Sequence, residues 1–184
     1  MRVIAGHWKG RRLKAGRGNI LRPTTDRVKE ALFSLLGARV TDSEVVDLCC
    51  GAGSLGIEAL SRGARLVHFV DSSPVAVALV RANLAVCRAS PETYVVKRAE
   101  ALSWLKRFLA CEPQHLTVVL ADPPYTTELA RAIIVELLQA PVAFPLGVAV
   151  VEHPSVVDWQ VPESDRLQCR QRRFGATTLT ILER

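Results

Sequence analysis

The 184-residue chain is predicted to fold as an α/β protein with a doubly wound, mostly parallel sheet. Two observations carry this prediction. Short apolar stretches with strand character alternate with stretches in which apolar residues recur at helical spacing. Such an alternation connects neighbouring parallel strands through right-handed crossover helices. Near the C-terminus no helical stretch separates the last two strand-like segments, which predicts an antiparallel hairpin at one side of a seven-stranded sheet.

The strands and helices can be placed from apolar periodicity and from capping residues. The predicted strands are 45–49, 66–70, 94–96, 116–120 and 148–151, followed by the hairpin strands 166–174 and 177–184 around Gly175. Helices are expected after the capping run 24–26 and at 54–62, 74–87, 101–109 and 130–138. Ser73 and Pro74 fit the N-cap and first position of the third helix, and Gly37 and Gly63 fit helix ends.

Composition indicates an ordinary globular domain. Apolar residues make up 49% of the chain, yet no run approaches 18 of them, and the first residues contain no apolar signal-peptide core. The five cysteines have no C-x-x-C spacing, and the four histidines have no ligand spacing. We therefore expect a cytoplasmic protein without membrane span, disulfide framework or bound metal.

Positive charge is concentrated at the N-terminus. Residues 1–40 contain ten basic and two acidic side chains, a net charge of +8, so the other 144 residues sum to −2 within the total of +6. We expect residues 1–22 to form a basic arm, folded as a small hairpin that turns near 7–10, and residues 23–184 to form the main domain. The arm predicts a polyanionic partner, nucleic acid ahead of a membrane, although a solvated arm kept for solubility remains an alternative.

The stretch VVDLCCGAGSLG at 45–56 contains a G-x-G-x-x-G pattern directly after the first predicted strand. In a doubly wound sheet, ligands bind beyond the carboxyl ends of the strands, where Gly51 and Gly53 lie. Asp71 ends the second strand and is placed to accept hydrogen bonds from ribose hydroxyls. These features fit a nicotinamide dinucleotide and S-adenosylmethionine equally well, and a tight turn without a ligand is the third reading.

The motif Asp122-Pro123-Pro124-Tyr125 at the end of the fourth strand favours S-adenosylmethionine. Consecutive prolines form a rigid stretch that presents carbonyl oxygens, and a carboxylate and an aromatic ring stand beside them. Such a set suits a flat base that carries an exocyclic amino group, whereas hydride transfer has no evident use for it. The lone pair of this amino group is spread into the ring. If Asp122 and the Pro123 carbonyl each accept one N–H, the lone pair is aimed at a methyl donor.

The chain resembles the class I methyltransferases that modify the N2 atom of a guanine in bacterial small-subunit ribosomal RNA. The matching stretches cover nearly the whole chain and are RVIAGHWKGRRL, RPTTDRVKEALFSLL, DLCCGAGSLGIEALSRGA, DPPY and RRFGATTLTIL. Two departures are the pair Cys49-Cys50, where the family more often has an aromatic and a small residue, and Asp71, where it more often has Glu. A Rossmann-like methyltransferase fold is implied by the resemblance.

The resemblance also implies roles for single residues. Cofactor contacts are implied for Asp47, Gly51, Gly53, Asp71 and Glu100, the last near the adenine amino group. Contact with the target base is implied for Asp122, Pro123, Pro124 and Tyr125, with 16S ribosomal RNA in the small subunit or its assembly intermediate as the substrate. The arm can then bind RNA phosphates through Arg11, Arg12, Lys14, Arg17, Arg22 and Arg27. Trp8 either stacks on an unpaired base or packs the arm onto the body.

Three other functions stay open on the sequence. An adenine-N6 methyltransferase acting on DNA or RNA shares the DPPY motif, although the chain leaves no room for a large separate target-recognition domain. A nicotinamide-dependent oxidoreductase fits the glycine loop. A non-catalytic RNA-binding or assembly protein that kept the fold fits the basic arm.

Overall fold

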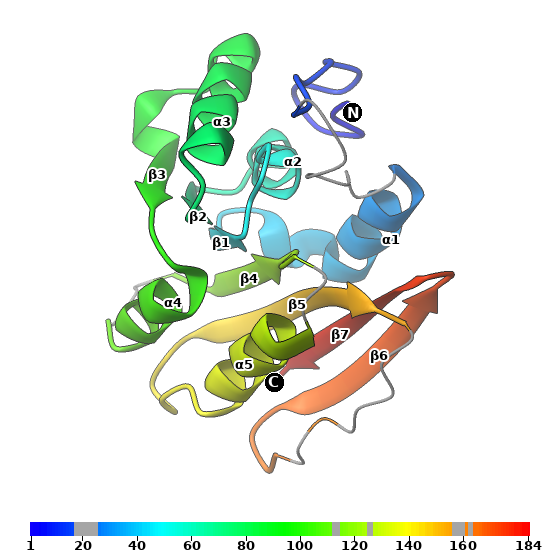
Figure 1. The fold of residues 1–184 in the computed structure, drawn as a ribbon, viewed down its shortest axis with the longest axis vertical. Coiled ribbons are helices and arrows are strands. Elements are labelled where there is room, and N and C mark those ends of the chain that lie inside the picture. Colours follow the sequence, from blue (N-terminus) through cyan, green and yellow to red (C-terminus); the bar gives the residue numbers. More distant parts are fainter. Residues whose placement is uncertain (17–25, 112–114, 125–126, 156–160, 162–163) are drawn as a thin grey trace.

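A computed structural model describes residues 1–16, 26–111, 115–124, 127–155, 161 and 164–184. These residues contain a seven-stranded sheet with the strand order β3-β2-β1-β4-β5-β7-β6 (Figure 1). Strands β1 to β5 are parallel, and β7 is antiparallel to both β5 and β6. The strands are β1 (Glu44–Leu48), β2 (Leu66–Asp71), β3 (Tyr94–Arg98), β4 (Thr117–Ala121), β5 (Leu146–Pro154), β6 (Gln168–Phe174) and β7 (Thr177–Glu183). The predicted fold class and the C-terminal hairpin are confirmed.

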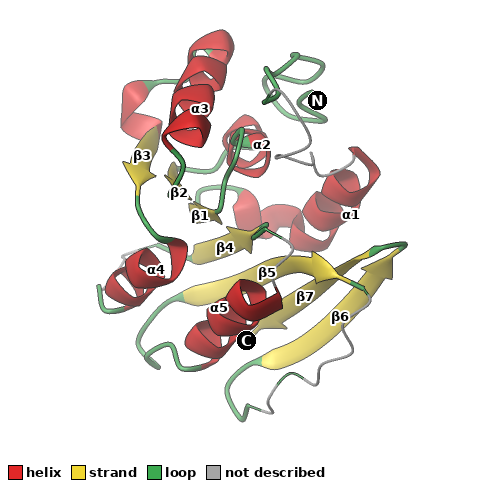
Figure 2. Ribbon diagram, viewed as in Figure 1, coloured by secondary structure: helices red, strands yellow, loops and turns green. Residues whose placement is uncertain are grey.

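Helices cover both faces of the sheet, as Figure 2 shows. One face carries α1 (Asp26–Leu36), α2 (Ser54–Ser61) and α3 (Pro74–Cys87), and the other carries α4 (Ala101–Leu109) and α5 (Thr127–Leu138). Short 3-10 turns are formed by η1 (Gly37–Val40) and η2 (Pro91–Thr93). The Ser73 hydroxyl caps α3 by accepting the Ala76 N–H at 3.3 Å, as the sequence predicts. No helix in these described ranges is long and apolar enough to cross a membrane.

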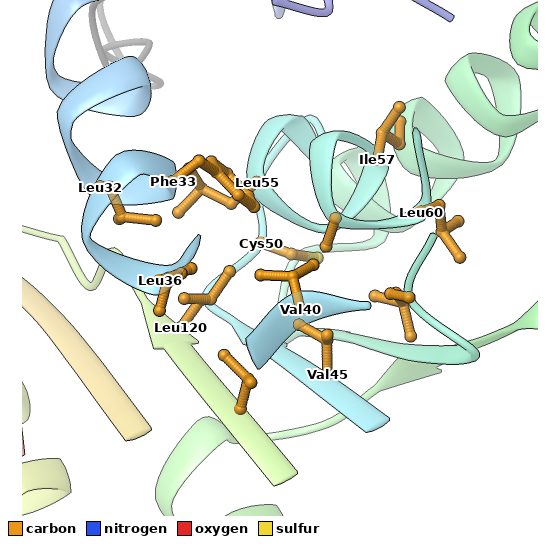
Figure 3. Packing of buried hydrophobic residues seen from close by; sticks show 14 of the residues in the cluster. Leu32, Phe33, Leu36, Val40, Val45, Cys50, Leu55, Ile57, Leu60 and Leu120 are labelled. Carbon is orange, nitrogen blue, oxygen red and sulfur yellow. The ribbon is translucent and has the colours of Figure 1, made fainter. Parts of the chain in front are cut away.

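The core is divided into two layers by the alternation of side chains along each strand. Val45 of β1 packs with residues of α1 and α2 on one face, and Figure 3 shows this layer with Phe33 and Leu55 close together. Val46 and Leu48 point to the opposite face, against α4 and α5. All five residues of β1 are buried, and the strand lies between β2 and β4 in the interior of the sheet.

The N-terminal arm is folded as the expected small hairpin. Arg2 and Arg12 form an antiparallel bridge, and the Gly10 N–H donates to the Val3 carbonyl at 2.9 Å. Val3 is buried in the core layer of α1 and α2, and Trp8 is half-buried against the same layer. Trp8 therefore packs the arm onto the body, which was one of the two roles predicted for it. The expected boundary of the arm near residue 22 lies outside the described residues.

Candidate functional site

The strand order reverses between β1 and β4, because the chain runs outward from β1 through β2 to β3 and then returns to β4. Ligands of doubly wound sheets bind in the crevice at such a reversal, beyond the carboxyl ends of the strands. The glycine loop follows β1 and the DPPY motif follows β4. The Asp122 N–H donates to the Leu48 carbonyl at 3.3 Å, so the two predicted motifs start side by side.

The glycine loop is a tight turn that needs its glycines. Gly51 and Gly53 have φ values of +53° and +76°, in the left-handed region that side chains disfavour. Gly56, inside α2, allows the helix to lie close against β2. A Cβ on Gly56 would lie 2.3 Å from Cε1 of the Phe69 ring. The three glycines of the pattern therefore set the shape of the turn and the distance between α2 and the sheet.

The Asp47 side chain fixes this loop through a hydrogen bond to its backbone. Its side chain is buried, and its Oδ2 accepts the Gly56 N–H at 2.8 Å. Burial raises the pKa of Asp47 well above its usual range. The Gly56 hydrogen bond opposes this shift, and the nearby Asp122 and Asp71 carboxylates add to it. The structure thus shows a residue that fixes the loop; the cofactor contact expected for Asp47 stays a prediction.

Asp71 fixes the other side of the loop. Its Oδ2 accepts the Gly51 N–H at 2.9 Å, and its Oδ1 accepts the Ser73 N–H at the same distance. The side chain is half-buried at the tip of β2, so a ligand in the crevice can still reach the carboxylate. Glu100 is exposed at the residue before α4, following β3.

Cys49 lies near these acidic side chains. Burial raises the pKa of the Cys49 thiol to about 12, and the carboxylates of Asp71, Asp122, Asp47 and Glu100, in that order, contribute to the shift. All four acidic residues expected at the site therefore lie near the turn that follows β1. Ionised carboxylates at this edge of the sheet favour a cationic ligand and disfavour a pyrophosphate.

The placement of Cys49 and Cys50 corrects the sequence prediction. Cys49 was expected to end the buried strand 45–49, but β1 ends at Leu48, and both cysteines belong to the turn. Cys49 has a φ of +55°, unusual for a residue with a side chain. Cys50 is buried and its carbonyl accepts the Gly53 N–H at 2.7 Å. Strand periodicity could not reveal this turn, because two small apolar residues continue the pattern of the strand.

The DPPY motif follows β4, next to the end of β1. Asp122 is half-buried, Pro123 is buried and Pro124 is exposed, so the motif runs outward from the sheet to the surface. Tyr125 lies outside the described residues, and its contact with a target base stays a prediction. Asp122 contributes to the raised pKa of both Asp47 and Cys49, so its carboxylate lies near the start of the glycine loop.

The predicted RNA-binding residues are only partly described. Arg12, Lys14 and Arg27 are exposed, as phosphate contacts require. Arg11 is half-buried, and its Nη1 donates to the Val86 carbonyl of α3 at 3.0 Å, so it also attaches the arm to the body. Arg17 and Arg22 lie outside the described residues.

Glu58 is a key residue that the sequence analysis missed. Its carboxylate is buried in α2 and accepts the N–H groups of Ile4 at 2.7 Å and Ala5 at 2.9 Å. It also pairs with Arg62 at 2.9 Å and with the buried Lys29 at 3.6 Å. An acidic residue within the apolar stretch 54–61 was the available signal, because a buried charge requires partners.

Lys29 adds to the net charge of residues 1–40 but not to their exposed positive charge. It counts toward the +8 of residues 1–40, but its side chain is buried. Burial lowers the pKa of Lys29, and the carboxylates of Glu58 and Asp26 oppose this shift. Its Nζ donates to the Arg2 carbonyl at 2.6 Å and to Ser54 Oγ at 3.2 Å. This charge therefore joins the arm to the start of α2 and is not presented to a partner.

Sequence comparison with known proteins identifies the family to which the chain belongs. The family model described as conserved hypothetical protein 95 matches residues 1–183. The chain belongs to this family. It is 40% identical over 134 residues to ribosomal RNA small subunit methyltransferase D of Haemophilus influenzae, covering 71% of this chain and 67% of that protein. It is 34% identical over 184 residues to YlbH of Bacillus subtilis, covering 100% of this chain and 99% of that protein.

A solved structure shares the fold of this chain. The protein yhhF of Escherichia coli superposes with a TM-score of 0.80 at 30% identity, covering 100% of this chain and 97% of that one. The resemblance to the rRNA methyltransferase family and the Rossmann-like fold, both predicted from the sequence, are confirmed. Membership of this family also supports a methyltransferase over an oxidoreductase.

Proposed function

We propose that the protein transfers a methyl group from S-adenosylmethionine to the N2 amino group of a guanine in 16S ribosomal RNA of the small subunit. The observation that carries the proposal is the juxtaposition of the two motifs. Asp122 directly follows β4 and the glycine loop directly follows β1, and the Asp122 N–H donates to the Leu48 carbonyl at the end of β1 at 3.3 Å. A methyl donor in the loop and an acceptor base at the motif would therefore be neighbours.

S-adenosylmethionine suits the charge of the crevice. The cofactor carries a positively charged sulfonium and an ammonium group, which the carboxylates around Cys49 would stabilise. Gly51 and Gly53 let its chain approach the backbone, and Asp71 and Glu100 would accept hydrogen bonds from ribose and adenine. A pyrophosphate would bring negative charge into the same pocket, which is the physical reason to prefer the methyl donor over a dinucleotide.

The residues of the DPPY motif supply the chemistry at the acceptor. Asp122 and the Pro123 carbonyl each accept one N–H of the guanine amino group, which leaves the nitrogen lone pair directed at the methyl group. On accepting the methyl group, this nitrogen would become cationic, and the sulfonium of the cofactor would leave as a neutral thioether. Asp122 stabilises this charge until the proton leaves to the carboxylate itself or to water. The bound cofactor contributes an activated methyl group.

The arm supplies the attachment to RNA. The exposed Arg12, Lys14 and Arg27 would bind phosphates, which position the RNA without reading its sequence. Such a substrate places the reaction in the cytoplasm, on the small subunit or an assembly intermediate. The homologous protein of Haemophilus influenzae is named as an rRNA small subunit methyltransferase, which supports the same substrate class here.

The product nucleoside tests the proposal. The protein is incubated with labelled S-adenosylmethionine and small subunits from a strain that lacks it, and in parallel with DNA, and the nucleic acid is digested for mass spectrometry. We expect N2-methylguanosine from the subunits, no labelled nucleoside from DNA, and no product with Asp122→Ala. N6-methyladenosine from DNA, or no labelled nucleoside from any ribosomal particle, would overturn the proposal.

A further inference from the structure

Asn83 joins the N-terminal arm to the glycine loop. This residue of α3 is buried, and its side-chain Oδ1 accepts the Lys14 N–H at 2.7 Å. Its Nδ2 donates to the Lys14 carbonyl at 3.0 Å and to the Ala52 carbonyl at 2.9 Å. Ala52 is the residue between Gly51 and Gly53. One side chain therefore holds the backbone of the arm and the backbone of the loop at the same time.

The side-chain amide of Asn83 matches the donors and acceptors of the two backbone segments that it joins. An asparagine amide group offers two N–H donors and one carbonyl acceptor, and here both donors and the acceptor are used between two segments. A carboxylate would provide no donor for the two carbonyls, and an apolar side chain would leave buried polar backbone groups unpaired. The Asn83 side chain can therefore form all three hydrogen bonds only when the arm and the loop keep this relative position.

A second connection runs in parallel. The Lys29 ammonium donates to the Arg2 carbonyl of the arm and to Ser54 Oγ, which directly follows Gly53 at the start of α2. Both ends of the arm hairpin, at Arg2 and at Lys14, are therefore linked to residues next to the loop glycines. A displacement of the arm would have to move the loop or break buried hydrogen bonds.

We propose that Asn83 couples RNA binding at the arm to cofactor binding at the glycine loop. The proposal rests on the proposed function, in that the arm is taken to bind RNA and the loop to bind S-adenosylmethionine. RNA that fixes the arm also fixes Ala52 in the conformation that receives the cofactor. By thermodynamic reciprocity, the cofactor must then strengthen RNA binding by the same factor. Asn83 is a positioning residue in this scheme, since it contacts neither ligand.

The coupling factor distinguishes this role from a purely structural one. The Kd of S-adenosylhomocysteine is measured by calorimetry with and without small-subunit rRNA, for the unmodified protein and for Asn83→Asp. We expect rRNA to tighten binding at least about fivefold in the unmodified protein, at the lower end of typical coupling factors. The ratio should fall toward one in Asn83→Asp, with only the connection through Lys29 left. A residue that only stabilised the fold would shift both Kd values together and leave the ratio unchanged, and that result would overturn the proposal.

Lys14→Ala serves as the matched control. It removes the exposed charge but keeps the backbone N–H and carbonyl that Asn83 binds. We expect weaker RNA binding with the coupling ratio retained. If Lys14→Ala lowers the coupling ratio as much as Asn83→Asp does, the charge and not the Asn83 link carries the effect, and the proposal is wrong.

Hydrogen exchange tests the link in the unmodified protein, whether or not the Asn83 variant folds. S-adenosylhomocysteine alone should slow exchange of the Lys14 amide, whose acceptor is Asn83, although Lys14 lies outside the cofactor crevice. Unchanged exchange at Lys14 on saturation would contradict the coupling. This result is independent of methyl transfer: absence of methylated nucleoside would overturn the proposed function, while ligand-dependent protection of Lys14 would still support the link.

Discussion

The backbone of Gly6 passes so close to Ser61 of α2 that a Cβ at position 6 would lie 1.7 Å from the Ser61 carbonyl oxygen. Around this contact the His7 N–H donates to the same carbonyl at 2.8 Å, and Ser61 Oγ donates to the Ala5 carbonyl at 2.6 Å. The arm of this protein is therefore seated against the body by backbone contacts that leave no space for a side chain at Gly6.

Gly6→Ala should detach the arm while the main domain stays folded. Gly6 has a φ of +79°, and the obstructing atom belongs to backbone, so neither the conformation nor the space allows a methyl group. We expect faster hydrogen exchange at the amides of residues 3–13 and a fall in rRNA methylation of about tenfold or more.

Gly10→Ala provides the matched control for this prediction. Gly10 has a similar φ of +82°, but a Cβ there would meet no atom within 4 Å. Only the conformational cost of about 1 kcal/mol should appear, with the arm still seated. Equal effects of the two substitutions would mean that the close approach to Ser61 does not hold the arm.

Asp122→Asn should separate binding from chemistry. The substitution keeps the size of the side chain but removes the charge that stabilises the cationic nitrogen. We expect the single-turnover rate of methyl transfer to small subunits to fall by about 10²–10³, the magnitude typical of a lost electrostatic contact in a transition state. Binding of S-adenosylhomocysteine and of rRNA should change less than about threefold. A rate within threefold of the unmodified protein would exclude Asp122 from the reaction.

Asp47 should make the free energy of unfolding depend on pH, and its raised pKa sets the direction of that dependence. Burial raises its pKa in the folded protein, so the folded state binds its proton more tightly than the unfolded state, where the pKa is about 3.9. Its contribution is fully present below that pH and is lost as the pH rises through the raised pKa.

Asp47→Asn removes this titration while retaining an oxygen to accept the Gly56 N–H. The free energy of unfolding, from urea titrations between pH 4 and 7.5, should favour the variant increasingly as the pH rises. A difference between the two proteins that is constant over this range would mean that Asp47 does not carry the predicted shift.

Gly56→Ala should test the close packing of α2 on β2. The new methyl group would lie 2.3 Å from the Phe69 ring and 2.9 Å from Val67 Cγ1, so core side chains must move. Overpacking of this kind costs about 1–3 kcal/mol of unfolding free energy. Phe69→Leu in the same chain should recover part of that loss, because it removes the obstructing ring. Simple additivity of the two substitutions in urea denaturation would argue against the contact.

The arm should give RNA binding a strong salt dependence. Replacing both Arg12 and Lys14 by Gln removes two exposed charges, which should lower the slope of log K against log salt by about 1.5. Arg107→Gln is the control, because this exposed residue lies on α4 at the opposite face of the sheet. An unchanged slope in the double variant, or an equal change in the control, would place the RNA elsewhere.

The sequence predicted the elements well because their signals are local. Ser73 and Pro74 mark the start of α3, Gly63 follows the end of α2, and the apolar runs mark the buried strands. The motifs then located the site, because loops after parallel strands must meet at one edge of the sheet.

The attachment of the arm was not predictable in the same way. Glu58 and Asn83 bind backbone groups that are more than 50 residues away in the chain, and no periodicity reports such contacts. Lys29 was counted in the positive charge of residues 1–40, and nothing in the sequence indicated that the buried carboxylate of Glu58 pairs with it. Cys49 continued the apolar pattern of β1, so its left-handed backbone was hidden.

A crystal structure with S-adenosylmethionine bound tests the central claim most directly. We expect the methyl group to face the gap between the Asp122 carboxylate and the Pro123 carbonyl, with room for an amino nitrogen about 3–3.5 Å from the methyl carbon. A cofactor whose methyl group points away from residues 122–124, or that binds outside the glycine loop, would contradict the account.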